Sequence, residues 1–186
     1  GLSAASRTGL VNNANDALAW GLLPVVMLGE GLTTIQIGTV AAVYPAVWGI
    51  AQLATGALSD RIGRRLPIAL GMWVQAGALL LFWKAGDFSQ MIVASAVLGL
   101  GTASTYPALL AAVGDVAAPS WRATAVGVYR TWRDAGYLVG AVTAGVLADL
   151  WGVGTALVIV AAVTAVSGWD AWINLHSSSD DLNSLE

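Results

Sequence analysis

The chain has 186 residues, of which 57% are hydrophobic and 10% are charged, and its mean hydropathy is +0.73. An ordinary soluble domain is about one quarter charged, so this composition is typical of a membrane-embedded protein. The 8 Lys and Arg face 11 Asp and Glu, which leaves no basic surface for nucleic acid, and we expect no nucleic-acid partner. Cysteine is absent and the single histidine lies in a polar tail, so we expect no disulfide, no cysteine-based metal site and no cofactor.

Six segments are long and apolar enough to cross a bilayer as helices, which takes about 20 mostly apolar residues. We therefore predict an all-α membrane protein, with a six-helix transmembrane bundle at residues 9–173, a linker at 1–8 and a polar cytoplasmic tail at 174–186. Because residues 1–8 look like the end of a linker, we expect the chain to be a piece of a longer protein or a processed subunit. The predicted helices occupy residues 9–28, 35–58, 66–84, 90–114, 123–148 and 154–173.

Basic residues are concentrated on one side of the predicted bundle. Short connections rich in Lys and Arg stay in the cytoplasm. Lys84 is the one basic residue on the opposite side, so we expect both termini to be cytoplasmic. The residues on the cytoplasmic side are Arg7, Arg61, Arg64, Arg65 and Arg122.

The chain contains an internal repeat. Residues 56–63 read GALSDRIG and residues 145–152 read GVLADLWG, and the two copies share the pattern G-x-L-[SA]-D-x-x-G. They follow the second and the fifth predicted helix, so they lie on opposite membrane faces. This placement predicts an inverted repeat of three helices plus three, which is a building plan of transporters.

The first copy, extended to residue 68, reads GALSDRIGRRLPI. Gly56 allows a neighbouring helix to approach, Asp60 can accept hydrogen bonds from a helix N-terminus, and Gly63 allows a tight turn. Arg61, Arg64 and Arg65 supply cytoplasmic charge and donors for carboxylates. This stretch resembles the signature loop between the second and third helices of each half in the major facilitator superfamily of transporters, G-x-L-[AS]-D-R-x-G-R-[RK]-x-x-[IL].

The resemblance implies a gating latch in this loop. In the family, the acidic residue and an arginine are linked to a further carboxylate at the end of the fourth helix, and the link favours one conformation. Carried over by position, the latch consists of Asp60, Arg64 and Asp115, the last within GDVAAP. The alternative is a loop that only anchors the topology.

The resemblance extends over nearly the whole chain. The segments NNANDALAWGLLP, YPAVWG and YRTWRDAGYLVGAVTAG look like the first, second and fifth helices of the second half of bacterial permeases. Members of the family have twelve helices in two halves, whereas six are predicted here. The resemblance thus implies a bacterial inner-membrane location and a partner: a second six-helix half, a second copy of this chain in a homodimer, or another membrane subunit.

Most of the charge inside the predicted helices sits in two places: Asp16 in the first helix, and Arg130, Arg133 and Asp134 in the fifth. Each costs roughly 2.5 to 3.5 kcal/mol at the bilayer centre if unpaired, so they are expected to be paired. Arg130 and Asp134 have the i, i+4 spacing that places both on one helical face. A structural ion-pair cluster and a role in binding substrate or protons are both compatible with this pattern.

Polar stripes accompany these charges. Such stripes suit a wet cavity, but they also suit interhelical hydrogen bonds. Together with the charged residues they form the candidate set for substrate or proton binding: Asn12, Asn13, Asp16, Tyr44, Trp48, Gln52, Arg130, Arg133 and Asp134.

The sequence therefore predicts half of a secondary active transporter that moves a small-molecule substrate through the lipid bilayer and is coupled to protons. The alternative is a non-transporting membrane scaffold or assembly subunit that kept the same fold. An enzyme is not expected, because the sequence holds no constellation of nucleophile, base and orienting group.

Overall fold

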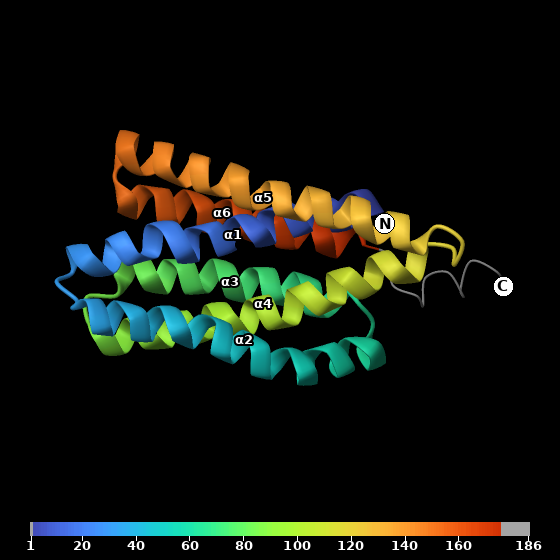
Figure 1. Cartoon of the computed structure of the whole chain (residues 1–186), viewed down its shortest axis with the longest axis horizontal. Helices are drawn as coiled ribbons and strands as arrows, with labels where there is room; N and C mark the ends of the chain where they lie inside the picture. Colours follow the sequence, from blue (N-terminus) through green and yellow to red (C-terminus); the bar gives the residue numbers. More distant parts are fainter. Residues whose placement is uncertain (1, 176–186) are drawn as a thin grey trace.

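The structure is a computed structural model, and it describes residues 2–175. The described residues form six α-helices and no strand, joined by short turns (Figure 1). The helices are α1 (Leu2–Gly29), α2 (Thr34–Ile62), α3 (Arg65–Lys84), α4 (Phe88–Val116), α5 (Arg122–Trp151) and α6 (Val153–Asn174).

The helix boundaries have local causes. Thr33 begins α2 with a capping box, in which its side chain accepts from the Gln36 amide and the Gln36 side chain accepts from the Thr33 amide. The Asp87 carboxylate caps α4 in a similar way. Gly63 and Gly152 end α2 and α5 with φ values of +87° and +84°, a conformation that favours glycine. These two glycines close the two copies of the repeated motif.

Four helices, α2, α3, α4 and α6, are long and apolar enough to cross a membrane by length and composition alone. The other two, α1 and α5, have 28 and 30 residues and carry the polar side chains described below. Residues 2–8, expected to be a linker, form the first turns of α1, because buried Ala4, Ala5 and Thr8 continue the packed face of that helix. Most of the predicted polar tail, residues 176–186, lies outside the described residues.

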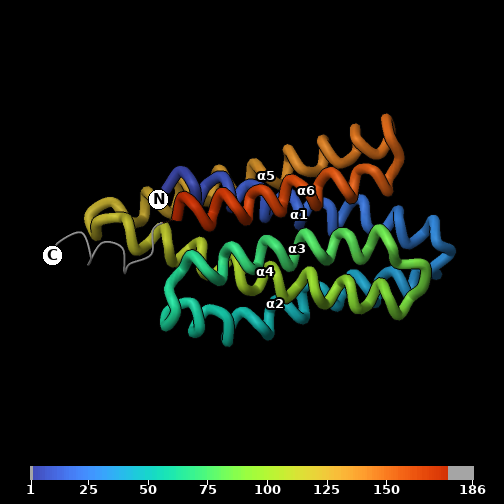
Figure 2. The backbone as a smooth tube through the Cα atoms, turned by 180° about the vertical axis from the view of Figure 1, so that it is seen from behind, coloured from blue at the N-terminus to red at the C-terminus, as the bar shows by residue number. Residues whose placement is uncertain are grey.

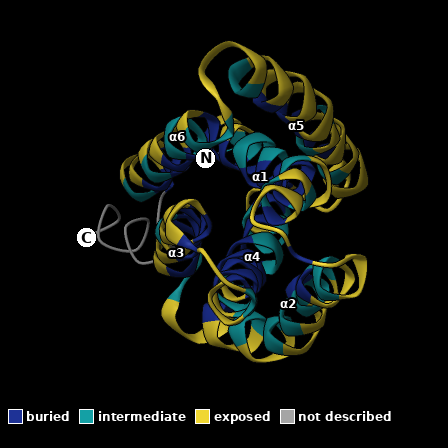
Figure 3. Cartoon of the chain, turned by 90° about the vertical axis from the view of Figure 1, so that its left-hand side faces the viewer, coloured by how far each residue is buried: buried dark blue, intermediate teal, exposed yellow. Residues whose placement is uncertain are grey.

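The first three helices, α1–α3, and the last three, α4–α6, pack against one another rather than as separate groups. The largest contacts join α1 to α5, α2 to α4, and α3 to both α4 and α6. Seen end-on, α3 and α6 lie on one side of the bundle, α2 and α5 on the other, and α1 and α4 between them (Figure 3). The view from behind shows the same neighbours, with α3 and α6 running side by side (Figure 2). Exchanging α1–α3 with α4–α6 turns the α1–α5 contact into the α4–α2 contact and leaves the α3–α6 pair unchanged, although α3 packs more extensively on α4 than α6 does on α1.

Two of the closest helix crossings, α1 with α5 and α2 with α4, are equivalent in the two repeats. A Cβ at Gly136 would lie 2.8 Å from the carbonyl carbon of Leu10, and a Cβ at Gly99 would lie 3.1 Å from the Cβ of Val47. The number of residues between Leu10 and Gly99 is the same as that between Val47 and Gly136. It also equals the separation of Asp60 and Asp149, which are equivalent positions in the two motif copies. The fold is thus a six-helix bundle built as a 3+3 inverted repeat, as the sequence predicted.

Candidate functional site

The carboxylate of Asp16 on α1 is held from two other helices. The Tyr44 hydroxyl of α2 donates a hydrogen bond to Asp16 Oδ1, and Arg133 Nη2 of α5 donates to Asp16 Oδ2 at 3.4 Å. Asp16 and Tyr44 are buried, and the Tyr44 hydroxyl also lies 3.1 Å from Thr102 Oγ1 of α4. We call Asp16, Tyr44 and Arg133 the Asp16 clamp. It joins both repeats, because Asp16 and Tyr44 belong to the first and Arg133 belongs to the second.

Arg133 is fixed by three further groups. Its Nη1 donates to Asp134 Oδ1 at 3.1 Å, and its guanidinium carbon lies 4.6 Å from the centre of the Tyr106 ring. The Asn13 amide of α1 donates to the backbone carbonyl of Arg133 at 3.0 Å. The guanidinium is therefore oriented by two carboxylates and one aromatic face.

The expected pair of Arg130 with Asp134 does not form. Asp134 binds Arg133 instead, and Arg130 is exposed, with no ion pair to any residue that the structure describes. The physical reason is that Arg133 is already immobilised by α1 and by Tyr106, so a bond to it orders fewer free side chains than a bond to the extended Arg130.

Aromatic rings surround the Asp16 clamp. Trp48 stacks on Tyr44 at a centroid distance of 6.1 Å and meets Tyr106 edge-on at 5.9 Å. The rings of Trp20 and Tyr44 meet at a steep angle of 66°, with a centroid distance of 6.2 Å. Gln52, one turn beyond Trp48 on α2, is half-buried, and its side chain has no hydrogen bond within residues 2–175. Of the predicted stripe on α2, Tyr44 and Trp48 therefore belong to the surroundings of Asp16.

Asn12 lies in a second polar network rather than in the Asp16 clamp. Its Oδ1 accepts from Gln75 Nε2 at 2.9 Å, and Gln75 Oε1 accepts from the Asn15 amide at 2.9 Å. Gln75 Nε2 also lies 3.3 Å from Thr105 Oγ1, and Thr164 donates to Asn15 at 3.0 Å. These buried bonds join α1 to α3, α4 and α6, which is the interhelical role that the sequence left as an alternative.

Several residues at these sites were missed from the sequence. Thr102 and Tyr106 lie one turn apart on α4, and Gln75 is an isolated amide in the apolar α3. A signal existed, since an uncharged polar group within an apolar membrane helix needs a partner. Nothing in the local sequence shows which distant helix supplies that partner.

The structure also brings the three latch residues together. Arg64 Nε donates to Asp115 Oδ2 at 2.9 Å, while Arg64 Nη1 donates to Asp60 and, at 2.9 Å, to Ser59 Oγ. Asp60 thus accepts from this guanidinium, and the first residue of α3 receives no side-chain cap, contrary to the expected helix N-terminus contact. Partial burial lowers the pKa of Arg64, but bonds to Asp115 and Asp60 outweigh it, and the pKa lies above its ordinary value. Arg64 therefore stays charged.

The remaining motif residues differ in their surroundings. A Cβ at Gly56 would meet Pro107 of α4 at 3.9 Å, an ordinary distance, so this crossing does not require glycine. Arg61 is exposed. The Arg65 guanidinium lies 4.2 Å from the ring centre of Trp172, and so it ties the loop to α6.

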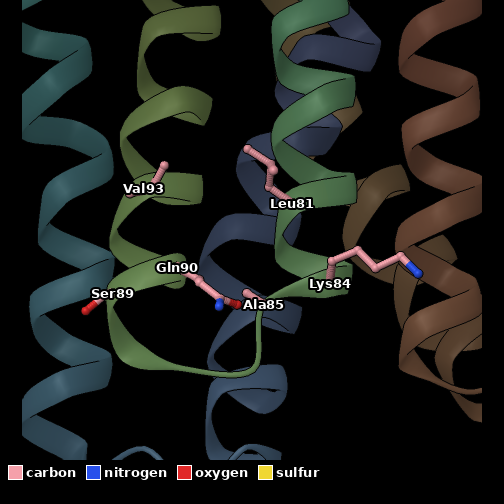
Figure 4. Close-up of a pocket in the computed structure, with 6 residues that line it drawn as sticks. All are labelled: Leu81, Lys84, Ala85, Ser89, Gln90 and Val93. Carbon is pink, nitrogen blue, oxygen red and sulfur yellow. The ribbon is translucent and has the colours of Figure 1, made fainter.

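The hollows near the other end of the bundle are separate from these sites. One of about 320 Å³ lies at the connection between α3 and α4 and is lined by Leu81, Lys84, Ala85, Ser89, Gln90 and Val93 (Figure 4). Another of about 480 Å³ is lined by α1, α3 and α6 and includes Glu30 and Trp83. Neither hollow shares a residue with the Asp16 clamp.

Residues 8–181 match the sequence profile of the Major Facilitator Superfamily. A probable L-galactonate transporter of Escherichia coli (strain K12) is 29% identical over 139 residues, which are 75% of this chain and 27% of that protein. The fosmidomycin resistance protein of the same strain is 23% identical over 175 residues, 90% of this chain and 43% of that protein. The quinolone resistance protein NorA of Staphylococcus aureus is 22% identical over 129 residues, 69% of this chain and 33% of that protein.

The chain spans less than half the length of each of these relatives. The family match, in contrast, covers nearly all of the chain, and the described residues fold as the inverted repeat that the two motif copies predicted. This chain is an integral membrane protein and belongs to the major facilitator superfamily.

Proposed function

We propose that this chain forms one six-helix half of a secondary active transporter that moves a small solute across a membrane together with protons. The observation that carries the proposal is the Asp16 clamp. A buried carboxylate on α1 is held by a neutral hydroxyl from its own repeat and by a cation from the other repeat. Ionisable groups at this depth are costly, and those that are retained in membrane helices commonly mark ion or substrate paths.

Protonation of Asp16 is the proposed coupling event. The proton removes the negative charge that holds Arg133, whereas the Tyr44 hydroxyl can still bond to a neutral carboxyl group. At 3.4 Å, the contact of Arg133 Nη2 with Asp16 is already at the long end of hydrogen-bond distances. Protonation therefore frees the Arg133 guanidinium from Asp16 while Asp16 stays bonded to Tyr44 of α2, and this differential contact can shift a conformational equilibrium.

The Arg64 latch is proposed as a second control on the same equilibrium. Its bonds connect the loop between α2 and α3 to the C-terminal end of α4. If α2 and α4 move relative to one another during transport, this link must break or slide. The latch would then favour the conformation in which it is intact, and both termini would lie on the cytoplasmic side with it.

A second six-helix unit is the proposed partner. The 29 residues of α2 bury only Val40, Tyr44 and Ser59, and α5 buries few more. The open side of α1, α2, α4 and α5 also carries the half-buried Gln52 and the exposed Arg130, which are poor contacts for lipid. A second half, a second copy or another subunit would cover this side.

The matched relatives are described as a probable L-galactonate transporter, a fosmidomycin resistance protein and a quinolone resistance protein. We propose to test uptake of radiolabelled galactonate, fosmidomycin and a quinolone. The chain, together with its native six-helix partner if it has one, would be reconstituted in vesicles, and a pH gradient would be imposed across the vesicle membrane. We expect one of these compounds to accumulate in response to the gradient.

The Asp16→Asn variant is expected to lose gradient-driven accumulation and to keep exchange of solute across the membrane, because the amide retains the shape but cannot ionise. Asp149→Asn is the matched control, since Asp149 is exposed at the far end of α5. Gradient-driven accumulation that survives Asp16→Asn would refute the proton role. Absence of any flux from a folded protein with all three compounds would favour the scaffold alternative.

A further inference from the structure

The charges around the Asp16 clamp cancel in this conformation. Asp16 contributes one negative charge and Arg133 one positive charge, and both side chains are largely buried, whereas the side chains of Asp134 and Arg130 are exposed. Tyr44 of α2, Tyr106 of α4 and Tyr129 of α5 are the other titratable groups around it. The helices α3 and α6 place neutral Gln75 and Thr164 against α1 at this level. A proton on Asp16 therefore leaves the described site with one net positive charge.

A net charge inside a membrane bundle is unfavourable, so the charge of the solute that binds with the proton is constrained. A solute with one negative charge restores neutrality. A neutral solute leaves one positive charge, and a cationic solute raises the charge to two. Charge balance thus favours an anion as the co-bound solute.

Buried hydrogen-bond donors that lack an acceptor also indicate an anionic solute. Among the described residues, the buried Trp48 Nε1 and Arg133 Nε have no hydrogen-bond partner. Both belong to side chains that contact the Tyr106 ring, Trp48 at 5.9 Å between ring centroids and Arg133 at 4.6 Å from its guanidinium carbon. Buried donors are normally satisfied, and a solute with several acceptor oxygens would satisfy them once Arg133 turns away from Asp16.

The walls next to these donors are flat and apolar. Tyr44 and Trp48 stack with an interplanar angle of 30°, and Tyr106 stands nearly perpendicular to Trp48 at 87°. Such faces bind a planar or apolar body by offset or edge contacts.

We propose that the solute of this site is a small organic acid with one negative charge and a flat or apolar body. Its acid group replaces Asp16 on Arg133 when Asp16 takes up a proton. The proposal rests on the proposed transport function but concerns binding, which can be measured without transport. Asp16 and the solute anion are then competitors for one guanidinium, and the proton decides between them.

Three probes of the same size and shape separate the charge classes: benzoate, benzamide and benzamidinium. The protein, with any native six-helix partner, is placed in lipid nanodiscs, and binding of radiolabelled benzoate is measured with the other two probes as competitors. We expect benzoate to bind about tenfold more tightly than benzamide, because of its charge-assisted bonds to Arg133. Benzoate binding should also strengthen as the pH falls, and benzamidinium should not compete.

Variants identify the residues involved. Asp16→Asn should raise benzoate affinity about tenfold and remove its dependence on pH, because Arg133 no longer has the competing carboxylate. A purely structural Asp16 would instead lower affinity or folded yield when replaced. The double variant Asp16→Asn with Arg133→Gln leaves neither clamp charge unpaired and should lose benzoate binding. Lys84→Gln, at the far end of α3 over Trp83, is the control and should bind normally.

Stronger binding of benzamidinium or benzamide than of benzoate would overturn the proposal, and so would no binding of any probe. Unchanged benzoate binding in the double variant would also overturn it. If benzoate binds as described but no pH gradient drives the uptake of any acid, the anion site stands and the transport function fails. If a gradient drives the uptake of a cation, transport stands and the anion class fails.

Discussion

Tyr44 and Arg133 occupy equivalent positions in the two repeats, and each binds one oxygen of the Asp16 carboxylate. Arg133 follows Tyr44 by the same number of residues as Asp149 follows Asp60 in the two motif copies. Gln75 and Thr164 have this same separation, and both are hydrogen-bonded to Asn15. Asp16 and Asn15 of α1 thus each bond to one pair of equivalent positions from the two repeats.

Removal of the Tyr44 hydroxyl should destabilise the bundle. In Tyr44→Phe, Asp16 Oδ1 and Thr102 lose a buried partner, at a cost of about 1–3 kcal/mol. The midpoint of thermal unfolding in detergent should fall accordingly. Tyr137→Phe on the exposed side of α5 is the control and should stay within about 0.5 kcal/mol of the parent protein. Equal midpoints for the two variants would contradict the importance of this bond.

The crossing of α1 and α5 should not tolerate a larger residue at Gly136. An added methyl group would collide with the Leu10 backbone, so Gly136→Ala should cost about 1–3 kcal/mol or more through overpacking. Gly145→Ala lies on the same helix, where a Cβ would meet nothing within 4 Å, and alanine there should be neutral or stabilising. Thermal unfolding of both variants tests this, and a tolerated Gly136→Ala would show that the helices cross elsewhere.

Two glutamines in membrane helices should respond differently to the same change. Gln75→Leu removes a fully buried amide and leaves Asn12 Oδ1 and Asn15 Nδ2 without their partners, so it should lower stability by about 1–3 kcal/mol. Gln52→Leu should leave stability nearly unchanged, because Gln52 is half-buried and has no such bonds among the described residues. Unfolding midpoints of the pair distinguish an interhelical network from solvent-facing polarity.

The latch should depend on Arg64 and not on its neighbour. Arg64→Gln breaks the bonds to Asp60 and Asp115 and should shift the balance of conformations, read as altered labelling of cysteines introduced along α2 and α5. Arg61→Gln removes the same charge from an exposed position and should not change the labelling. Identical labelling in both variants would reduce this loop to an anchor of topology.

The membrane orientation can be tested by labelling single introduced cysteines, and no native cysteine has to be removed first because the chain contains none. Ser120→Cys lies in the connection between α4 and α5 and should react only with reagents that reach the cytoplasm. Gly86→Cys lies in the connection between α3 and α4 and should react from outside intact cells. Labelling of Ser120→Cys by an impermeant reagent applied to intact cells would contradict the predicted orientation.

The sequence by itself determined the helices and the repeat. In a bilayer, backbone groups must be satisfied within each spanning segment, so runs of apolar residues between polar breaks are sufficient to place the helices. The two glycines that end the motif copies, and the charged Asp16 and Arg133, were also visible in the chain, because each is unusual for its local setting.

Only the tertiary structure decided which polar groups meet. Asn12 and Asp16 are one turn apart on α1, yet Asn12 bonds to Gln75 and Asp16 bonds to Tyr44 and Arg133. Local spacing likewise suggested a pair of Arg130 with Asp134, but Asp134 binds Arg133, which α1 and Tyr106 hold in place. The choice depends on the rotation of each helix and on the side chains that distant helices present, and these follow from packing across the whole bundle rather than from neighbouring residues.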